Sequence, residues 1–332
     1  MPTIKDVAQA AGVSVGTVSR VLAKNESVKL PLKTRVLEAM EALSYKPNLA
    51  ARALRTNSIA VIGLILPDIT NPFFAQLAKC VEMEVADHGY SVMLANSHEC
   101  VETERTQLTA LLDRAVSGVI IVASSDGDNS YTAPVPIISL DRRFGECPLI
   151  ATDHFEGSRQ IAAHLYALGH RHIAYIAGPQ SMETARQRRE GFVSQIEELT
   201  SLEDPIKLEI YEGQFDYDSG EDMARTIFNN GDKSLRPTAI AAASDQQAIG
   251  VLRCARDLNL SIPKELSVTG FDDISLASLV VPRLTTLRQP IERLAKYAVK
   301  RVLDGSAEKL DEKLLGDLVE RESTARVTSP IT

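Results

Sequence analysis

Eight short apolar runs alternate with helical stretches over most of the chain, and this alternation limits the fold more than any other feature. The runs cover residues 60–66, 90–95, 118–123, 135–140, 172–177, 207–211, 239–243 and 266–270. Apolar strands separated by helices are typical of parallel sheets that are covered on both faces. The runs divide into two sets of four near residues 153–157. The sequence therefore predicts an α/β core, residues 59–332, with two similar lobes of doubly wound parallel sheet.

The N-terminal segment has a different pattern, which predicts a helix-turn-helix. Apolar residues spaced as on one helical face mark a first helix: Ile4, Val7, Ala8 and Ala11. Thr3 and Asp6 form a capping-box-like start. Gly12 then interrupts the periodicity, and Ser14 can cap a second helix. The inward residues of that helix are Val18, Val21 and Leu22. A third helix is predicted at about residues 32–43, so the plan is that of a helix-turn-helix domain.

The charge of the chain is divided in the same way. Residues 1–56 carry nine basic and four acidic side chains, a formal charge of +5; the whole chain carries −8, which leaves −13 for the rest. A basic segment joined to an acidic body indicates that only the first part binds a polyanion such as nucleic acid. Arg20 can contact a guanine or a phosphate. The exposed residues of the second helix are candidates for DNA contact: Val15, Gly16, Thr17, Ser19 and Arg20.

The segments TIKDVAQAAGVSVGTVSR (residues 3–20) and YKPNLAARALRTNSIAVIGLILPDITNPFF (residues 45–74) resemble the lactose-repressor (LacI/GalR) family of bacterial transcription regulators. The resemblance runs over nearly the whole chain. It implies a headpiece (1–47), a hinge helix and linker (48–58), and a core like that of periplasmic binding proteins. It adds Thr3 and Ser14 to the predicted DNA contacts. It also implies that the chain crosses between the lobes near residues 286–290 and again near 318–321.

The hinge is Ala-rich, and a helix of its length is marginal alone in water. The resemblance implies that it becomes helical on operator DNA, beside its copy from a second subunit. Leu54 would then wedge into the minor groove, and Arg52 and Arg55 would lie near phosphates. Asn48 and Ala51 complete the predicted hinge contacts. The residues by themselves favour a plain linker. Pro31 departs from the capping serine that is commoner in the family, which leaves the start of the third helix open.

Polar and aromatic residues gather where the predicted strands end, which is where open parallel sheets bind ligands. Carboxylates, guanidinium groups and an amide can bond vicinal hydroxyls, and phenylalanine rings can cover the C–H faces of a sugar. This mixture indicates a neutral polyhydroxylated ligand. As alternatives, Asp245 and Asp273 could cap helices, and Phe73 or Phe74 could belong to the core. The candidate effector-binding residues are Asn71, Phe73, Phe74, Asp141, Arg142, Arg188, Phe215, Ser244, Asp272 and Arg288.

This set resembles the pentose pocket of ribose-binding proteins and ribose-type repressors. The matching pieces are NPFF at residues 71–74, Asp141-Arg142, Arg188 before EGF at 190–192, Phe215 and Asp272. Ser244 stands where those proteins usually have asparagine, so another pentose, a hexose or a nucleoside stays open as the ligand. Met182 replaces an arginine that purine-responsive members tend to have, which disfavours a purine corepressor. We expect Asp272→Ala to remove ligand binding and to leave folding largely intact.

Several other classes are disfavoured by what the sequence lacks. It has no run of about 18 apolar residues, no secretory signal, no metal-ligand spacing among its four cysteines, and no phosphate loop or catalytic pair. Unpaired cysteines are typical of a cytoplasmic protein. We expect a cytoplasmic, non-enzymatic repressor without a cofactor, with operator DNA, a small sugar-like effector and a second copy as partners. The tail has no leucine heptads, which favours a homodimer. A sugar-binding protein without regulation and a Rossmann-type enzyme are the alternatives.

Overall fold

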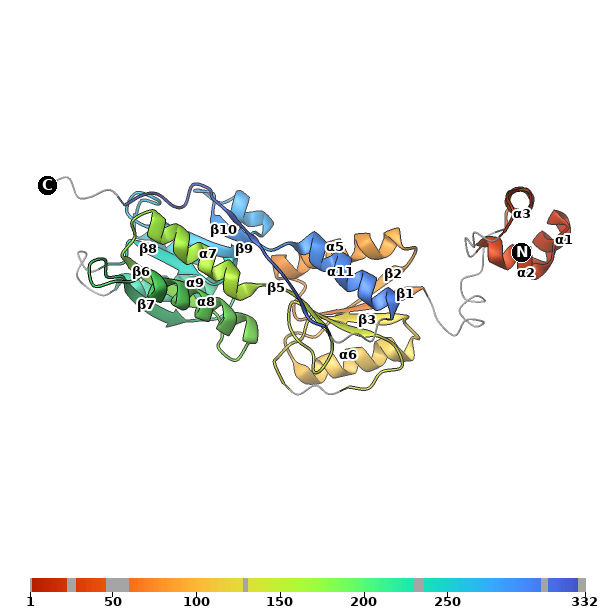
Figure 1. Ribbon diagram of the computed structural model, residues 1–332, viewed down its shortest axis with the longest axis horizontal. Helices are drawn as coiled ribbons and strands as arrows, with labels where there is room; N and C mark the ends of the chain where they lie inside the picture. The colour runs from red at the N-terminus through yellow and green to blue at the C-terminus, as the bar shows by residue number, and fades with distance from the viewer. Residues whose placement is uncertain are drawn as a thin grey trace. The chain divides into compact units, whose positions relative to one another are not determined.

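The structure is a computed structural model that describes residues 2–22, 28–45, 60–127, 131–229, 236–305 and 310–327 (Figure 1). The chain divides into two compact units, Met1–Ala60 and Val61–Thr332. Among the described residues, no helix has both the length and the apolar character needed to span a bilayer.

The first unit contains three helices, α1 (Ile4–Ala11), α2 (Val15–Leu22) and α3 (Leu30–Ala42). The predicted first and second helices are confirmed, and so is the capping box between Thr3 and Asp6. The third helix begins two residues before its predicted start. Pro31 lies in its first turn, where the missing N–H costs nothing. The small core of this unit consists of Val7, Ala8, Ala11, Val18, Val21, Val36 and Ala39.

The turn between α1 and α2 depends on Gly12 and on an arginine that sequence reasoning had counted only as a charge. Gly12 has φ 60°, a left-handed conformation that favours glycine. Arg35 of α3 donates to the carbonyl oxygens of Ala11 (2.5 Å) and Gly12 (3.3 Å). These bonds satisfy carbonyls that the end of α1 leaves without helical partners. Arg35 thereby fixes the third helix to the turn.

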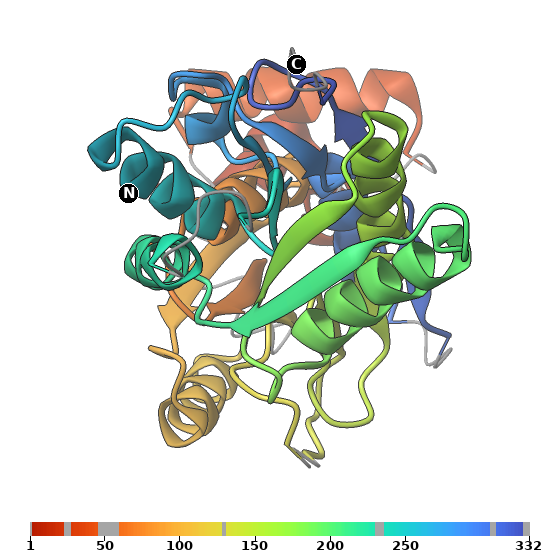
Figure 2. The ribbon, with the colours of Figure 1, turned by 90° about the vertical axis from the view of Figure 1, so that its left-hand side faces the viewer.

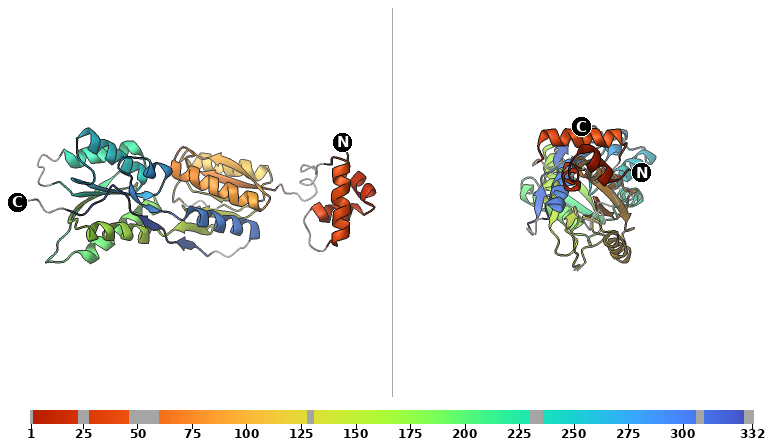
Figure 3. Two further views of the ribbon diagram at one scale, coloured as in Figure 1. Left: turned by 90° about the horizontal axis from the view of Figure 1, so that it is seen from above. Right: turned by 90° about the vertical axis from the view of Figure 1, so that its right-hand side faces the viewer.

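The N-terminal lobe of the second unit is a parallel sheet in the order β11-β5-β4-β3-β1-β2. Alternate residues of β1 face opposite sides. Leu64 contributes to the core under α5 and α11, which lie side by side (Figure 3), and Ile65 to the core under α6. The elements are β1 (Val61–Leu66), α5 (Pro72–Asp87), β2 (Ser91–Asn96), α6 (Val101–Asp113), β3 (Gly118–Ile121), β4 (Ile137–Leu140), β5 (Leu149–Thr152), α11 (Ile291–Asp304) and β11 (Glu312–Leu314).

The C-terminal lobe repeats this plan in the order β12-β10-β9-β8-β6-β7, with β12 antiparallel to β10. Helices α7 and α8 cover one face of its sheet, and α9 and α10 cover the other (Figure 2). The elements are α7 (His154–Ala167), β6 (His172–Ala177), α8 (Glu183–Leu199), β7 (Lys207–Glu212), α9 (Tyr217–Phe228), β8 (Ala239–Ala242), α10 (Asp245–Asp257), β9 (Ser267–Asp272), the 3-10 helix η2 (Ser275–Ser278), β10 (Thr285–Arg288) and β12 (Asp317–Val319).

The chain passes between the lobes three times. The first passage follows β5 at Asp153, where the two sets of runs were predicted to divide. The second lies between β10 and α11, within the predicted range 286–290. The third lies between β11 and β12 at residues 315–316, slightly before the predicted range 318–321. The two-lobed α/β prediction is confirmed, and the three connections meet at the base of the cleft between the lobes.

Candidate functional site: the interlobe cleft and the headpiece surface

The cleft between the two lobes contains two adjoining compartments. The inner one has a volume of about 20 Å³ and the outer one about 390 Å³. Nine of the ten predicted effector residues line the inner compartment, and only Arg288 does not. Three of the nine also line the outer compartment. The lining residues of the inner compartment are Asn71, Phe73, Phe74, Asp141, Arg142, Thr184, Arg188, Phe215, Ser244, Gln246 and Asp272.

The C-terminal lobe presents a buried ion pair to the inner compartment. Nη2 of Arg188 lies 3.1 Å from Oδ1 of Asp272, and both side chains are buried. Nη1 of Arg188 donates to the carbonyl of Ala243 (2.6 Å). Its guanidinium also lies over the ring of Phe271, 3.9 Å from the centroid. A paired charge with several further contacts is held in one orientation.

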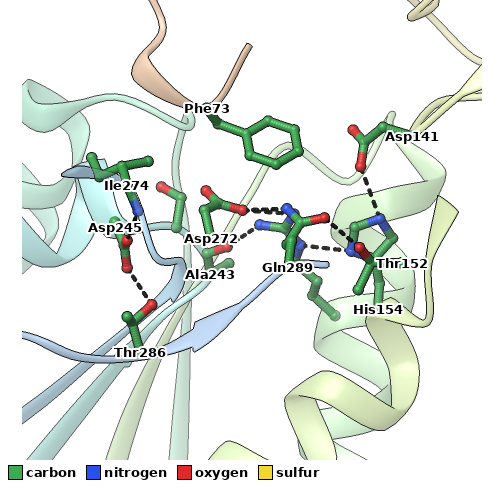
Figure 4. Close-up of polar contacts among 12 residues, drawn as sticks. Phe73, Asp141, Thr152, His154, Ala243, Asp245, Asp272, Ile274, Thr286 and Gln289 are labelled. Carbon is green, nitrogen blue, oxygen red and sulfur yellow. Dashed lines mark hydrogen bonds and ion pairs between the residues drawn. The ribbon is translucent and has the colours of Figure 1, made fainter. Parts of the chain in front are cut away.

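Asp272 keeps one oxygen for a ligand. Gln289 donates to Oδ1 (2.7 Å), the same oxygen that meets Arg188, while Oδ2 has no partner among the described residues. Burial raises the pKa of Asp272 to about 6, although Arg188 and Gln289 favour the charged form. The ring of Phe73, which comes from the other lobe, faces Asp272 and Gln289 (Figure 4). A carboxyl group with a raised pKa in a cleft is a common feature of functional sites.

Arg288 does not line the inner compartment, and its neighbour Gln289 bonds to a residue that does. The Arg288 side chain is exposed and donates to Asp273 (2.6 Å) instead of entering the cleft. Successive strand residues point to opposite sides, so the buried Gln289, directly after β10, faces inward. Its Oε1 accepts from Thr152 of the other lobe (2.6 Å). Gln289 therefore connects Asp272 to the first passage between the lobes, which directly follows Thr152. An amide directly after a buried run was the available signal for it.

His154, which sequence reasoning did not single out, joins the two walls. It begins α7, and its Nδ1 accepts from Nε of Arg188 at 3.3 Å. The proton therefore lies on Nε2, which is 3.3 Å from Oδ1 of Asp141. Burial and the charge of Arg188 lower the pKa of His154. Burial opposes the ionisation of Asp141, but the bond with His154 and the nearby Arg142 and Arg188 lower its pKa overall.

The N-terminal lobe presents an arginine with unused donors. Arg142 is only 7% exposed, and its Nε and Nη1 have no hydrogen-bond partner among the described residues. Its guanidinium lies 5.1 Å from the ring centroid of Phe74. Burial lowers its pKa, while the carboxylate of Asp141 opposes that effect. Buried donors without partners are costly, so this side chain is suited to a ligand that brings acceptor oxygens.

Several predicted ligand residues also have structural roles. The side chain of Asn71 caps α5 by accepting from Phe73 N–H (3.0 Å), and that of Ser244 caps α10 by accepting from Gln247 N–H (3.2 Å). Their remaining donors are left for the inner compartment. Phe73 and Phe74 belong to the core of the N-terminal lobe as well as to the cleft.

Neither aspartate considered as a helix cap has that role. Asp245 is fully buried, where it accepts from Thr286 Oγ1 (2.5 Å) and Ile274 N–H (2.8 Å) (Figure 4). Burial raises its pKa, and the negative charge of Asp272 adds to the effect. Asp273 pairs with Arg288 and Arg321. Both carboxylates hold loops of the C-terminal lobe together.

The second helix of the headpiece exposes most of the predicted DNA contacts. Val15, Gly16 and Arg20 are exposed, whereas Thr17 and Ser19 are half-buried. The Ser14 side chain accepts from Thr17 N–H (3.1 Å) and so caps α2. Nε of Arg20 donates to Gly16 O (3.3 Å) along the helix surface. Thr3 takes part in the capping box of α1. The predicted hinge contacts Asn48, Ala51, Arg52, Leu54 and Arg55 lie outside the described residues.

Comparison with known proteins identifies the family of this chain. Residues 3–48 match the family described as bacterial regulatory proteins, lacI family, and residues 162–324 match a periplasmic binding protein-like domain. The ribose operon repressor of Halalkalibacterium halodurans is 37% identical over 307 residues, which cover 91% of this chain and 90% of that protein. The chain belongs to the LacI family of bacterial regulatory proteins. The resemblance on which the sequence analysis drew is thereby confirmed.

Two solved structures place the LacI-family fold on nearly all of the chain. The lac repressor dimer bound to operator and the anti-inducer ONPF has a TM-score of 0.80 at 31% identity, covering 98% of this chain and 99% of that one. A LacI family regulator from Enterococcus faecium with bound ribose has a TM-score of 0.71 at 29% identity, covering 81% of this chain and 100% of that one. As a LacI-family member, the protein is a DNA-binding transcription regulator with an effector-binding core.

Proposed function

We propose that the protein is a dimeric transcriptional repressor whose affinity for operator DNA is lowered by a sugar effector in the interlobe cleft. The observation that carries the proposal is that Arg142, a buried guanidinium with two donors that no described residue uses, lines the same compartment as Asp272, whose Oδ2 is free. Sugar hydroxyls can accept from the first and donate to the second. Phenylalanine rings around the same compartment suit the apolar faces of a sugar ring.

The headpiece binds the operator through α2. Its exposed N-terminal half has short side chains, which allow a close approach to base edges in the major groove, and Arg20 supplies a guanine or phosphate contact. Thr3, Ser14, Val15, Gly16, Thr17 and Ser19 complete this surface. In the hinge, Leu54 opens a base step, while Asn48, Ala51, Arg52 and Arg55 contact the surrounding groove and phosphates.

The coupling between the cleft and the DNA follows from the position of the cleft between the lobes. A bound sugar contacts Arg142 from one lobe and Asp272 from the other, so it favours the lobe arrangement that brings both within reach. That arrangement spreads the two hinges of the dimer and weakens operator binding. The coupling free energy of such systems is typically about 1–3 kcal/mol.

A second copy of the chain covers an exposed apolar surface on both lobes. The exposed Met83 on α5 lines a groove of about 560 Å³ with Ile291 of α11 and Ser275 of η2, and the rest of the lining is mostly polar or charged. Leu279 and Val281, which follow η2, are 71% and 93% exposed. Exposed apolar surfaces of this kind mark interaction sites. The lac repressor to which the chain is similar is described as a dimer, which supports the same assembly here.

The proposal is tested by selecting an operator from a random-sequence library with the full chain, and then titrating it with and without a panel of sugars. We expect a near-palindromic site, an affinity that falls steeply with salt because Lys and Arg displace counterions from phosphate, and release by at least one sugar. Arg20→Ala is expected to cost about 1–3 kcal/mol at that site. No sequence preference in the selection, or no response to any sugar or sugar derivative, would contradict the proposal.

A further inference from the structure

The outer compartment of the cleft is much larger than the inner one, although the predicted sugar contacts belong to the inner one. The inner volume of about 20 Å³ is that of one or two water molecules. A sugar ring therefore enters only when the lobes or their side chains move apart, which costs free energy. The outer volume of about 390 Å³ already lies in the range of ligand pockets, roughly 300–1,000 Å³.

The outer compartment has a chemistry of its own. Of the twelve described residues that line it, three are acidic and only Arg142 is basic. Asp68 accepts from Thr70, and Asp216 caps α9. The carboxylate of Glu99 is exposed, and it lies near enough to Arg142 to favour the charged form of that guanidinium. Apolar and aromatic surface is also present, from Pro179, Met182, Phe215 and Tyr217.

Gln246 stands at the junction of the two compartments and lines both. It is 8% exposed, yet its amide has no hydrogen bond to any described residue. Arg142, with its two unused donors, lines both compartments as well. Buried guanidinium donors without partners are costly, and the Gln246 amide, whose polar atoms are not fully buried, offers a further donor and acceptor beside them. A ligand that satisfies both extends across the junction.

We propose that the effector is a glycoside and not a free sugar: its sugar ring enters the inner compartment, and a second group joined to the ring occupies the outer one. This inference rests on the proposed function and names the class of its effector. The second group is uncharged or cationic, because Glu99, Asp68 and Asp216 give the outer walls a negative charge. Contacts of the second group supply the binding free energy that opening the inner compartment requires. Gln246 bonds near the glycosidic link.

Calorimetry with the full chain tests this inference with D-ribose, adenosine, cytidine, xylobiose and 5-carboxycytidine. We expect at least one neutral glycoside to bind about tenfold or more tightly than ribose, a difference of about 1.4 kcal/mol. Adenosine and cytidine probe a nitrogen base as the second group, and xylobiose probes a second sugar. 5-Carboxycytidine is expected to bind at least about tenfold more weakly than cytidine, because the carboxylate on its base meets the carboxylates of the outer wall.

Two substitutions test which residues cause the preference for a neutral glycoside. Gln246→Met keeps the volume but removes the amide, and it should bring the ratio of glycoside to ribose affinity close to one. Glu99→Gln removes a carboxylate from the outer wall and should reduce the difference in affinity between 5-carboxycytidine and cytidine. Glu146→Gln, an exposed residue of the same lobe outside the cleft, makes the same charge change and should alter neither ratio. Thermal melting confirms that each variant is folded.

The outcomes separate this inference from the proposed function. Ribose binding as tightly as every glycoside, or an unchanged ratio in folded Gln246→Met, would overturn the glycoside inference and leave a sugar-responsive repressor. If no sugar or glycoside binds to a chain that binds its operator, the sugar effector itself is wrong. A neutral glycoside that binds preferentially, and loses that preference in Gln246→Met, supports both.

Discussion

The two walls of the cleft differ in how completely their charged groups are paired. In the C-terminal lobe, Arg188 and Asp272 bond to each other and to surrounding protein atoms. In the N-terminal lobe, Arg142 is equally buried but keeps Nε and Nη1 without partners. On the C-terminal wall the charges are paired before a ligand arrives, although Oδ2 of Asp272 stays free, whereas on the N-terminal wall the ligand supplies the partners of Arg142. Substitutions on the two walls should therefore separate the stability of the fold from its affinity for the effector.

The largest effect on stability and binding is expected from Asp272→Ala, on the C-terminal wall of the cleft. It leaves the buried Arg188 without its counter-charge, which should lower the free energy of unfolding by about 3–5 kcal/mol and abolish effector binding. The double variant Asp272→Leu with Arg188→Met should recover much of the stability but not the binding. Urea denaturation measures the first effect and calorimetry the second. A single variant that unfolds at the wild-type midpoint would show that the pairing on this wall does not stabilise the fold.

Arg142→Met, on the N-terminal wall of the cleft, should lower the affinity for the effector without lowering the stability of the fold. The substitution removes unused donors and leaves no protein group newly unpaired at the positions of Nε and Nη1. We expect the effector affinity to fall by about 1.5–3 kcal/mol, the contribution of a charged hydrogen bond, and the urea midpoint to stay the same or rise. A loss of stability similar to that of Asp272→Ala would remove the distinction between the walls.

The pH dependence of binding should report Asp272. Its pKa is raised to about 6 by burial, and ligand hydroxyls donate to the ionised form. Affinity should therefore rise as the pH increases through about 6, and fall about tenfold for each unit below it, since one pKa unit corresponds to 1.36 kcal/mol. In Asp272→Asn, the residual affinity should lose this dependence. Tighter effector binding at pH 5 than at pH 7.5 would contradict this prediction.

The smallest effect is expected at the rim. Arg186 of the C-terminal lobe and Asp126 of the N-terminal lobe form an ion pair across the cleft, with a distance of 2.9 Å between Nη2 and Oδ2. Both side chains are partly exposed, so Asp126→Asn should change effector affinity by about 1 kcal/mol or less. Glu198→Gln breaks a comparable pair within one lobe, Arg159–Glu198, and should leave affinity unchanged. Equal changes of effector affinity in the two variants would show that the Arg186–Asp126 pair has no role in lobe closure.

Much of the fold could be predicted because its strands are apolar and its helices periodic. The run that became β1 contains five consecutive buried residues, which is a strong local signal. Strands β11 and β12 have three residues each, with polar residues among them. They are strands only because the returning chain pairs with β5 and β10. Such pairing depends on contacts between distant segments, which local patterns do not contain.

The cleft residues could be predicted from their position after strands, but their partners could not. Arg288 and Gln289 are neighbours, and the direction in which each points depends on the register of β10 at a crossover. His154 enters the cleft because α7 begins at the first passage between the lobes. The pairing of Arg188 with Asp272 also changes the earlier expectation that Asp272→Ala would leave folding largely intact. Each difference comes from tertiary geometry and not from residue type.

The most direct test of the account is the operator affinity of the full chain, measured by fluorescence anisotropy at fixed salt, with and without the effector, for wild type and Arg142→Met. The account predicts that the effector weakens operator binding by wild type about 5–150-fold, which corresponds to a coupling of 1–3 kcal/mol. Arg142→Met should bind the operator as wild type does, and it should need about 10–100-fold more effector for the same response, which corresponds to its loss of effector affinity. An equal response in both proteins, or none in wild type, would contradict it.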